Sequence, residues 1–478
     1  MKPPRERQSP AEVLARLRSK RANDVDWSEG KTFAYVFAPD REARELVEAA
    51  SRMFLWENAL DPTVCPSLVE MESEIIAMAA GHLGGDENTV GNFTSGGTES
   101  VLLSVKTARD WARANRPEIE APELVLPITA HACFHKGCEY FGIKPVVVPV
   151  DPLSCRVDPE VMRRAITPST ILLVASAPSY AHGVLDPIRE IGAIAQEADL
   201  LFHVDGCIGA FLMPFLRKLG AAIPDFDLGV PGVSSISMDL HKYGFAPKGA
   251  SVILYRDKSL RRHQIFSCSG WTGYAVVNPT IQSSRSGGPV AAAWTLLQHF
   301  GEEGYLEIAR ALKRSTDEII AGVENLEDIH LIGEPSMSIV AFGSDSVNLF
   351  RLADELKRNG WHVQPQLRFG DVPESIHLTI VPVTLRTTGA FLHDLEEALH
   401  TMRATKAPPN PLLDTLKGVD LASLTPDAIE ALLGAAGLGG GKLPGDMAEI
   451  NEILNILPIE ARDALLTAFF NEIGIRHR

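Results

Sequence analysis

The sequence lacks the features expected of a secreted or membrane-spanning protein. Its six cysteines form no CxxC pair, and their scatter excludes a disulfide framework. No run reaches the roughly 18 uninterrupted apolar residues that a membrane span requires. The first twenty residues are polar and basic, without the apolar core of a signal peptide. We therefore expect a soluble, cytoplasmic protein without an integral membrane span.

Positive charge is also scarce. The 478 residues include 45 Lys and Arg against 61 Asp and Glu, which leaves a net charge of −16. This balance excludes nucleic acid and anionic membrane surfaces as main partners. The chain is 45% hydrophobic and 22% charged, as in ordinary globular enzymes, and its length suggests two or three structural units. We expect no metal site.

The middle of the chain alternates between short apolar strands and helices. The expected strands are Leu124–Ile128, Pro145–Val150, Ile171–Ser176, Leu200–Val204, Ser235–Met238 and Ser251–Leu254. Helices are expected between them, at Glu99–Asn115 and Pro187–Glu197. This alternation predicts an α/β domain whose mostly parallel sheet is covered by helices on both faces.

We divide the chain into four parts. An N-terminal helical arm covers residues 1–90, and the large α/β domain covers 91–290. A smaller α+β domain is expected at 291–405. Residues 406–478 form a Pro/Gly-rich linker followed by a terminal helical pair, expected at Ala448–Leu454 and Pro458–Ile473.

The strongest chemical signal is Lys242, in the segment Ser237–Gly249. An average lysine lies on the surface, but this one follows an expected strand and is crowded by aromatic, His and Gly residues. A lysine that forms a Schiff base must be partly desolvated or lie near other cations, so that its amine is neutral often enough to react. His241 and Lys248 could provide that environment.

A carboxylate and a histidine also follow expected strands. Asp205 lies where Leu200–Val204 ends, and ligands of open α/β sheets bind at such ends. It could keep a pyridinium nitrogen protonated, although capping the next helix is an equally good explanation. His131 follows Leu124–Ile128 and could stack on a flat cofactor, although a lone histidine is more often structural.

A glycine turn precedes the helix expected at Glu99–Asn115. Gly97 and Thr98, in the sequence TSGGTES, would let backbone amides approach a phosphate at the helix N-terminus. Alone this motif is weak, because Thr98 also resembles an ordinary N-cap. The glycine turn, His131, Asp205 and Lys242 together indicate a bound pyridoxal 5′-phosphate (PLP).

These motifs resemble the fold-type I PLP enzymes of the group II decarboxylase branch, and most of all the sphingosine-1-phosphate lyases. The likeness extends from about residue 34 to residue 401. The motifs that carry it are TSGGTES (94–100), AHACFHKG (130–137), HGVLDP (182–187), HVDGCIGAF (203–211), HKYGFAPKG (241–249) and PTIQSSRSGG (279–288).

The resemblance implies a large domain with a mostly parallel seven-stranded sheet, a homodimer and a shared active site. It implies that Lys242 binds PLP covalently, that Asp205 pairs with the ring nitrogen and that His131 stacks on the ring. The phosphate of PLP would be held by Gly97, Thr98, His241 and, from the neighbouring subunit, Ser284. Tyr35 and Lys248 match residues near the substrate's phosphate and reacting carbon, and Asn58 matches a contact to the substrate's phosphate.

One departure from the lyase pattern leaves the substrate open. The family pattern Asn-Pro-Leu-His is Asn58-Ala59-Leu60-Asp61 here, and the acid Asp61 would repel a phosphomonoester. The expected reaction is a retro-aldol cleavage of Cα–Cβ that yields an aldehyde and phosphoethanolamine.

Two alternatives remain. In an amino-acid decarboxylase, Lys248 would pair with a substrate acid and Asp61 with a substrate cation. A PLP-binding protein without catalysis is disfavoured by the intact set of Lys242, Asp205 and His131.

Overall fold

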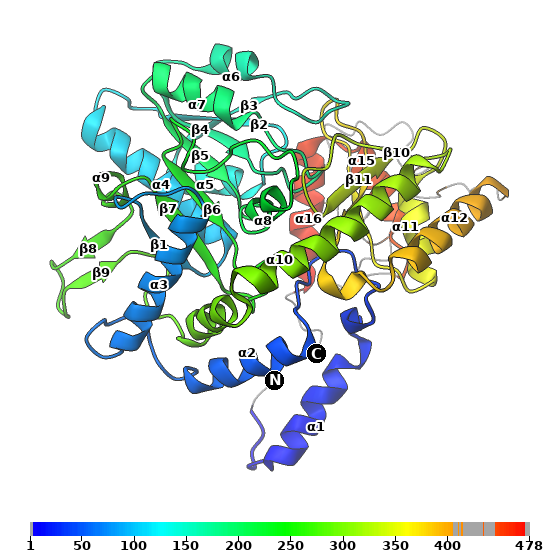
Figure 1. Cartoon of the computed structure of the whole chain (residues 1–478), viewed down its shortest axis with the longest axis horizontal. Coiled ribbons are helices and arrows are strands. Elements are labelled where there is room, and N and C mark those ends of the chain that lie inside the picture. Colours follow the sequence, from blue (N-terminus) through cyan, green and yellow to red (C-terminus); the bar gives the residue numbers. More distant parts are fainter. Residues whose placement is uncertain (1–2, 405–409, 411–412, 414–433, 435–444, 474–478) are drawn as a thin grey trace.

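The structure is a computed structural model that describes residues 3–404, 410, 413, 434 and 445–473 (Figure 1). Most of the predicted linker after residue 405 lies outside these residues. No helix in the described part of the chain has an apolar stretch long enough to cross a membrane. The N-terminal helices are α1 (Pro10–Lys20), η1 (Arg21–Asn23), η2 (Trp27–Glu29) and α2 (Arg41–Met53).

A seven-stranded sheet forms the centre of the large domain and confirms the predicted fold class. Its strands are β1 (Val90–Thr94), β2 (Glu123–Pro127), β3 (Lys144–Val148), β4 (Thr170–Ser176), β5 (Leu201–Asp205), β6 (Ser235–Met238) and β7 (Ser251–Tyr255). Their order is β1-β7-β6-β5-β4-β2-β3. The run from β6 to β3 is parallel, and β7 is antiparallel to both of its neighbours.

Helices cover both faces of this sheet. They are α3 (Pro66–His82), α4 (Gly97–Asn115), α5 (Cys133–Phe141), α6 (Pro159–Ala165), α7 (Ile188–Glu197), α8 (Met213–Lys218) and α9 (Lys258–Arg261). Every residue of β4 is buried, as expected for a central strand packed on both sides. Leu172 and Val174 pack in the α4–α5 layer, while Leu173 and Ala175 belong to the core on the opposite face.

The small domain is built on a four-stranded antiparallel sheet of order β10-β11-β13-β12. Its elements are β10 (His330–Leu331), β11 (Ile339–Gly343), α11 (Leu349–Arg358), β12 (Gln364–Gln366), β13 (Ser375–Thr379), η3 (Pro382–Thr384) and α12 (Thr388–Ala404). The long helix α10 (Gly288–Glu324) joins the two domains and contains one non-helical residue, Gly301.

Three further elements lie at the edges of the molecule. The short hairpin of β8 (Phe266–Cys268) and β9 (Val276–Asn278) projects away from the body, and so does α1 (Figure 1). Helix α1 has no buried residue. The terminal pair, α15 (Ala448–Ile456) and α16 (Ile459–Ile473), packs on the small domain through α11.

Candidate active site

A cavity of about 350 Å³ opens where β2, β4, β5 and β6 end. Ligands of open α/β sheets bind at this edge, because the carboxyl ends of parallel strands converge there. Six of the predicted site residues line the cavity: Gly97, Thr98, His131, Asp205, His241 and Lys242. The fold therefore brings the predicted cofactor residues together, although they come from motifs far apart in the chain.

The glycine turn between β1 and α4 forms one wall. Gly96 is the N-cap of α4 and has φ +148°, a conformation that favours glycine. A side-chain carbon at Gly97 would lie 2.7 Å from Asp239 Oδ2 and 2.8 Å from Cys207 Sγ. Thr98 is not the N-cap, because the helix already begins at Gly97. Only glycine leaves this wall open to a ligand at the start of the helix.

Glu99 joins the glycine turn to a distant segment. Its side chain is buried; Oε2 accepts a hydrogen bond from Ser95 N at 2.6 Å, and Oε1 accepts one from Ile281 N at 2.8 Å. Gln282 N also lies 3.3 Å from Oε1. One carboxylate therefore fixes the cavity wall and the segment after β9 relative to each other.

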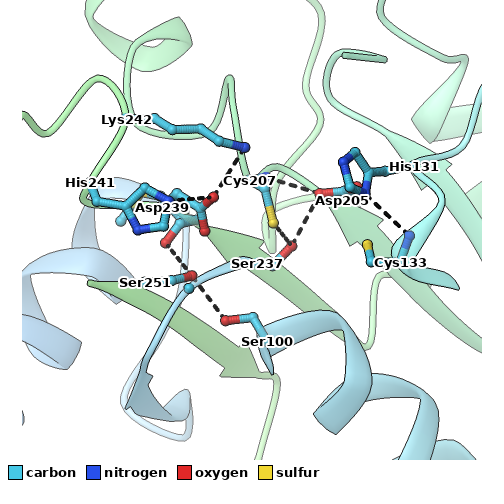
Figure 2. Close-up of polar contacts among 12 residues, drawn as sticks. Ser100, His131, Cys133, Asp205, Cys207, Ser237, Asp239, His241, Lys242 and Ser251 are labelled. Carbon is cyan, nitrogen blue, oxygen red and sulfur yellow. Dashed lines mark hydrogen bonds and ion pairs between the residues drawn. The ribbon is translucent and has the colours of Figure 1, made fainter. Parts of the chain in front are cut away.

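Lys242 is held by a carboxylate that the sequence did not reveal. Asp239 is 2% exposed, and its Oδ2 lies 3.0 Å from Lys242 Nζ and 3.5 Å from His241 Nε2 (Figure 2). Burial alone would lower the pKa of Lys242, but Asp239 outweighs it and the pKa is raised. The expectation that the neighbours of Lys242 favour its neutral amine is therefore wrong for the structure, because the nearest charge is a carboxylate. Burial lowers the pKa of His241 to about 4, which leaves its ring neutral near pH 7.

Asp205 and His131 lie on the opposite side of Cys207 from Asp239 (Figure 2). Asp205 Oδ1 accepts a hydrogen bond from Cys207 N at 3.0 Å, and the carboxylate is 7% exposed. The carboxylate thus fixes the turn after β5 as well as facing the cavity. His131 Nδ1 accepts a hydrogen bond from Cys133 N at 3.2 Å, which orients the ring. Burial lowers the pKa of His131, so the ring is neutral and can stack on an aromatic ligand.

Lys248 and Tyr35 lie beside the cavity and do not line it. Lys248 Nζ lies 5.0 Å above the ring of Phe37 and 3.4 Å from His241 O. Burial of this ammonium, with the nearby Lys242, lowers the pKa of Lys248 to about 8. Tyr35 has φ +65°, which is rare for a residue with a bulky side chain.

The remaining predicted residues form a separate cluster. Asn58 Nδ2 donates a hydrogen bond to Ser284 Oγ at 3.3 Å, and Asn58 pairs with Ser286 in a β-bridge. Asp61 accepts hydrogen bonds from Thr63, which lower the pKa of its exposed carboxyl. None of Asn58, Asp61 and Ser284 lines the cavity of their own chain.

Sequence reasoning missed three residues of the site. Glu99 lies inside the motif TSGGTES, and Asp239 lies inside the segment Ser237–Gly249, but their partners are set by tertiary contacts. Tyr180 lines the cavity, stacks on His377 at 4.6 Å and has its pKa raised to about 12 by burial, with Tyr35 nearby. An aromatic residue four positions beyond the end of β4 was the signal that could have identified Tyr180.

Two family models match the chain. Residues 48–344 match the pyridoxal-dependent decarboxylase conserved domain. Residues 410–472 match the C-terminal putative HTH domain of pyridoxal-dependent enzymes, and many of these lie outside the described residues.

Individual relatives agree with these matches. The chain is 41% identical over 405 residues to a sphingosine-1-phosphate lyase of Arabidopsis thaliana, covering 83% of this chain and 73% of the relative. It is similar to the structure of a Burkholderia pseudomallei sphingosine-1-phosphate lyase, with 34% identity and a TM-score of 0.81 over 89% of this chain and 97% of that one. A Lactobacillus brevis glutamate decarboxylase shares the fold at 21% identity, with a TM-score of 0.75 over 85% of this chain and 96% of that one.

Proposed function

The chain belongs to the pyridoxal-dependent decarboxylase family, and within it to the sphingosine-1-phosphate lyases, and from this we propose that it cleaves Cα–Cβ of a phosphorylated long-chain amino alcohol. The products would be a long-chain aldehyde and phosphoethanolamine. The observation that carries the proposal is the single cavity in which Lys242, Asp205 and His131 meet the glycine turn. The second candidate function is that of an amino-acid decarboxylase, which uses the same cofactor but breaks the bond between Cα and the carboxylate.

The cavity fits PLP, the cofactor of this family. The glycine turn leaves room for a phosphate at the start of α4, since a side chain at Gly97 would fill it. Among the described residues, His241 Nδ1 is buried without a hydrogen-bond partner at this turn. We propose that Gly97, Thr98 and His241 hold the phosphate. When bound, PLP accepts the electron pair of the broken bond.

The other cavity residues would hold and orient the ring. We assign Lys242 the covalent attachment, Asp205 the pairing with the ring nitrogen and His131 the stacking on one face. Asp239 has a supporting role: it provides a negative charge 3.0 Å from Lys242 Nζ, so a proton can stay on that amine when substrate displaces it. These assignments rest on side chains that lie together and face one cavity.

Cleavage requires that a proton leave the substrate's β-hydroxyl. Lys248 is suited to accept it, because its pKa of about 8 leaves a neutral fraction of the amine near physiological pH. Tyr35 is the second candidate, because it lies near Tyr180, which lines the cavity. Burial raises the pKa of Tyr35, so it would act as a hydrogen-bond donor or relay rather than as a base.

We further propose that the enzyme is a cytoplasmic homodimer in which Ser284 and Asn58 complete the partner's site. Their cluster lies outside the cavity of their own chain, and exposed apolar side chains are frequent in the neighbouring stretches of the sequence. Patches of exposed apolar side chains are typical of interfaces. These side chains are Met53, Leu55, Trp56, Val64, Phe266, Trp271, Tyr274, Val277 and Ile281. All six cysteines are free, which fits a reducing compartment.

Asp61 is the observation that favours the decarboxylase. Its carboxyl has a lowered pKa and is ionised near pH 7, so in a shared site it would repel a substrate phosphate and attract a substrate cation. The lyase remains the better supported function, because Tyr35, Lys248 and the overall similarity to lyases are retained.

The test combines a spectrum with product analysis. Purified protein is expected to show a visible cofactor band that is absent in Lys242→Ala and present in the control Lys258→Ala, which changes a lysine on α9. The protein is then mixed with a phosphorylated sphingoid base and with a panel of amino acids. Aldehyde release supports the lyase, whereas carbon dioxide without aldehyde supports the decarboxylase. Absence of a cofactor band after PLP is added would overturn both.

A further inference from the structure

A second chamber adjoins the active-site cavity. Its volume is about 230 Å³, and it shares His131 and Tyr180 with the first cavity. The two residues face each other edge to face, with ring centroids 6.2 Å apart, and so form the partition between the two spaces. The far wall is the segment 366–375 of the small domain. A substrate held at Lys242 could therefore extend past this partition.

The walls of the chamber are mainly apolar. Ile128, Ala181, Leu367, Phe369 and Val372 line it, and none of its described lining residues is Asp, Glu, Lys or Arg. Some polar side chains bond to the protein itself: Gln366 Nε2 donates to Ala181 O at 2.7 Å, and Tyr180 Oη donates to Gln364 at 2.7 Å. Among the described residues, Thr129 Oγ1 and His182 Nδ1 are buried without a hydrogen-bond partner. Such a lining favours a hydrocarbon over a charged or strongly hydrated group.

The far wall, segment 366–375, is bonded to the C-terminal helical pair. Leu367 packs against the apolar core of α15 and α16, and the next residue, Arg368, donates its backbone N–H to Asn455 Oδ1 at 2.7 Å. Helix α15 is itself fixed to α11, where Asp354 accepts hydrogen bonds from the backbone of Met447 and Ala448. The tail is thus bonded directly to the segment that encloses the chamber.

We propose that this chamber binds the alkyl chain of the substrate and that the C-terminal helical pair holds its wall in place. The proposal rests on the proposed lyase function and assigns the part of the site that recognises the hydrocarbon. If a methylene takes about the 30 Å³ of a water in the liquid, the chamber holds roughly eight methylenes. The affinity of the protein for the substrate should then rise with the length of the alkyl chain up to about this length, and should level off for longer chains.

Filling the chamber tests its occupant. Ala181→Leu adds three carbons to the wall and should displace about three methylenes of chain. We expect kcat/KM for a long-chain phosphorylated 2-amino-3-hydroxyalkane to fall roughly ten- to fiftyfold, mostly through KM. The short-chain homologue should react as in wild type. The control Ala193→Leu, on the exposed side of α7, should change neither. Equal losses for long and short chains in Ala181→Leu would overturn the proposal.

A second measurement needs no catalysis. Primary alkylamines of increasing length are titrated into PLP-loaded protein, and binding is followed by the change in cofactor absorbance. Wild-type affinity should rise with length, and the rise should stop at shorter chains in Ala181→Leu. This outcome would support the chamber even if no aldehyde is released from any substrate, in which case only the lyase proposal fails. Affinity independent of length would overturn the chamber proposal even in an active lyase.

The role of the tail is tested at one hydrogen bond. Asn455→Ala removes the acceptor for Arg368 N, whereas the control Asn451→Ala changes the same residue type on the same helix. We expect the first to raise KM for the long-chain substrate several-fold without altering kcat or the short-chain KM. If KM depends on alkyl-chain length in both variants as it does in wild type, the C-terminal helical pair does not position this wall.

Discussion

The pKa of Lys248 leads to a direct test of the proton-transfer step. The residue as a whole is exposed, but its ammonium lies over Phe37. Partial burial of this ammonium, with the nearby Lys242, lowers the pKa of Lys248 to about 8. At pH 7 about one tenth of the amine is neutral. If that neutral amine takes the proton from the substrate, kcat should rise roughly tenfold between pH 7 and its alkaline limit. The rise should have an apparent pKa of about 8.

Two substitutions separate the charge of Lys248 from its titration. Lys248→Arg keeps a positive charge that does not lose its proton in this range, and Lys248→Met removes both. A positioned base contributes a factor of about 10² to 10⁴ in rate. We therefore expect kcat to fall by a factor of that size in both variants. Neither variant should show the rise in kcat near pH 8. Lys31→Met is the matched control, because Lys31 Nζ also lies over an aromatic ring, 4.8 Å from the centroid of Trp361.

The assay is aldehyde release under saturating substrate across the neutral and alkaline range. Cofactor absorbance is recorded on each sample, so that loss of PLP is not mistaken for loss of proton transfer. Lys31→Met should follow the wild-type profile. The reasoning is refuted if the Lys248→Met variant has the wild-type kcat. It is also refuted if kcat of the Lys248→Arg variant still rises near pH 8.

Three further expectations concern cofactor binding and stability. Gly97→Ala should weaken PLP binding at least about tenfold in a cofactor titration, because its Cβ would meet Asp239 and Cys207, whereas Gly81→Ala, with open space around it, should not. In cofactor-stripped protein, Asp239→Asn should cost about 3–5 kcal/mol in urea unfolding, because it leaves the Lys242 charge unpaired. Burial raises the pKa of Asp186 to about 7, so the folded state keeps a proton that the unfolded state releases near pH 4. Stability should therefore fall as pH rises from about 4 to about 7, and Asp186→Asn should abolish that fall in urea midpoints.

The central sheet could be predicted because its strands are continuous apolar runs. Ser235–Met238 is observed with the predicted bounds, and the other expected strands lie within a few residues of the observed ones. Four strands were missed: the two short strands Phe266–Cys268 and Val276–Asn278 of one hairpin, and two strands at the edges of larger sheets. Val90–Thr94 contains Gly91 and Asn92, and Gln364–Gln366 is polar with a central proline, so neither shows an apolar pattern. Both lie at the edge of a sheet, where pairing rather than burial defines a strand.

The candidate site was predictable where chemistry lies at or shortly after the end of a strand. Asp205 is the last residue of β5, whereas His131 and Lys242 lie four residues beyond the ends of β2 and β6. The fold brings these strand ends to the same edge. The ion pair of Asp239 was not predictable, because an Asp three residues before a lysine has no fixed direction outside a helix. The bond from Glu99 to Ile281 spans 182 residues and depends on how the segment after β9 returns to the cavity.

That bond has a consequence for protein engineering. Glu99 accepts hydrogen bonds from Ser95 and Ile281 at the same time. The glycine turn and the segment after β9 therefore depend on each other and have to be transferred together. A graft of residues 94–100 into another scaffold would carry a buried carboxylate without its second partner, and an unpaired buried charge is costly. A transplantable version of this glycine turn must include residues 281–282 or replace Glu99 by an uncharged residue.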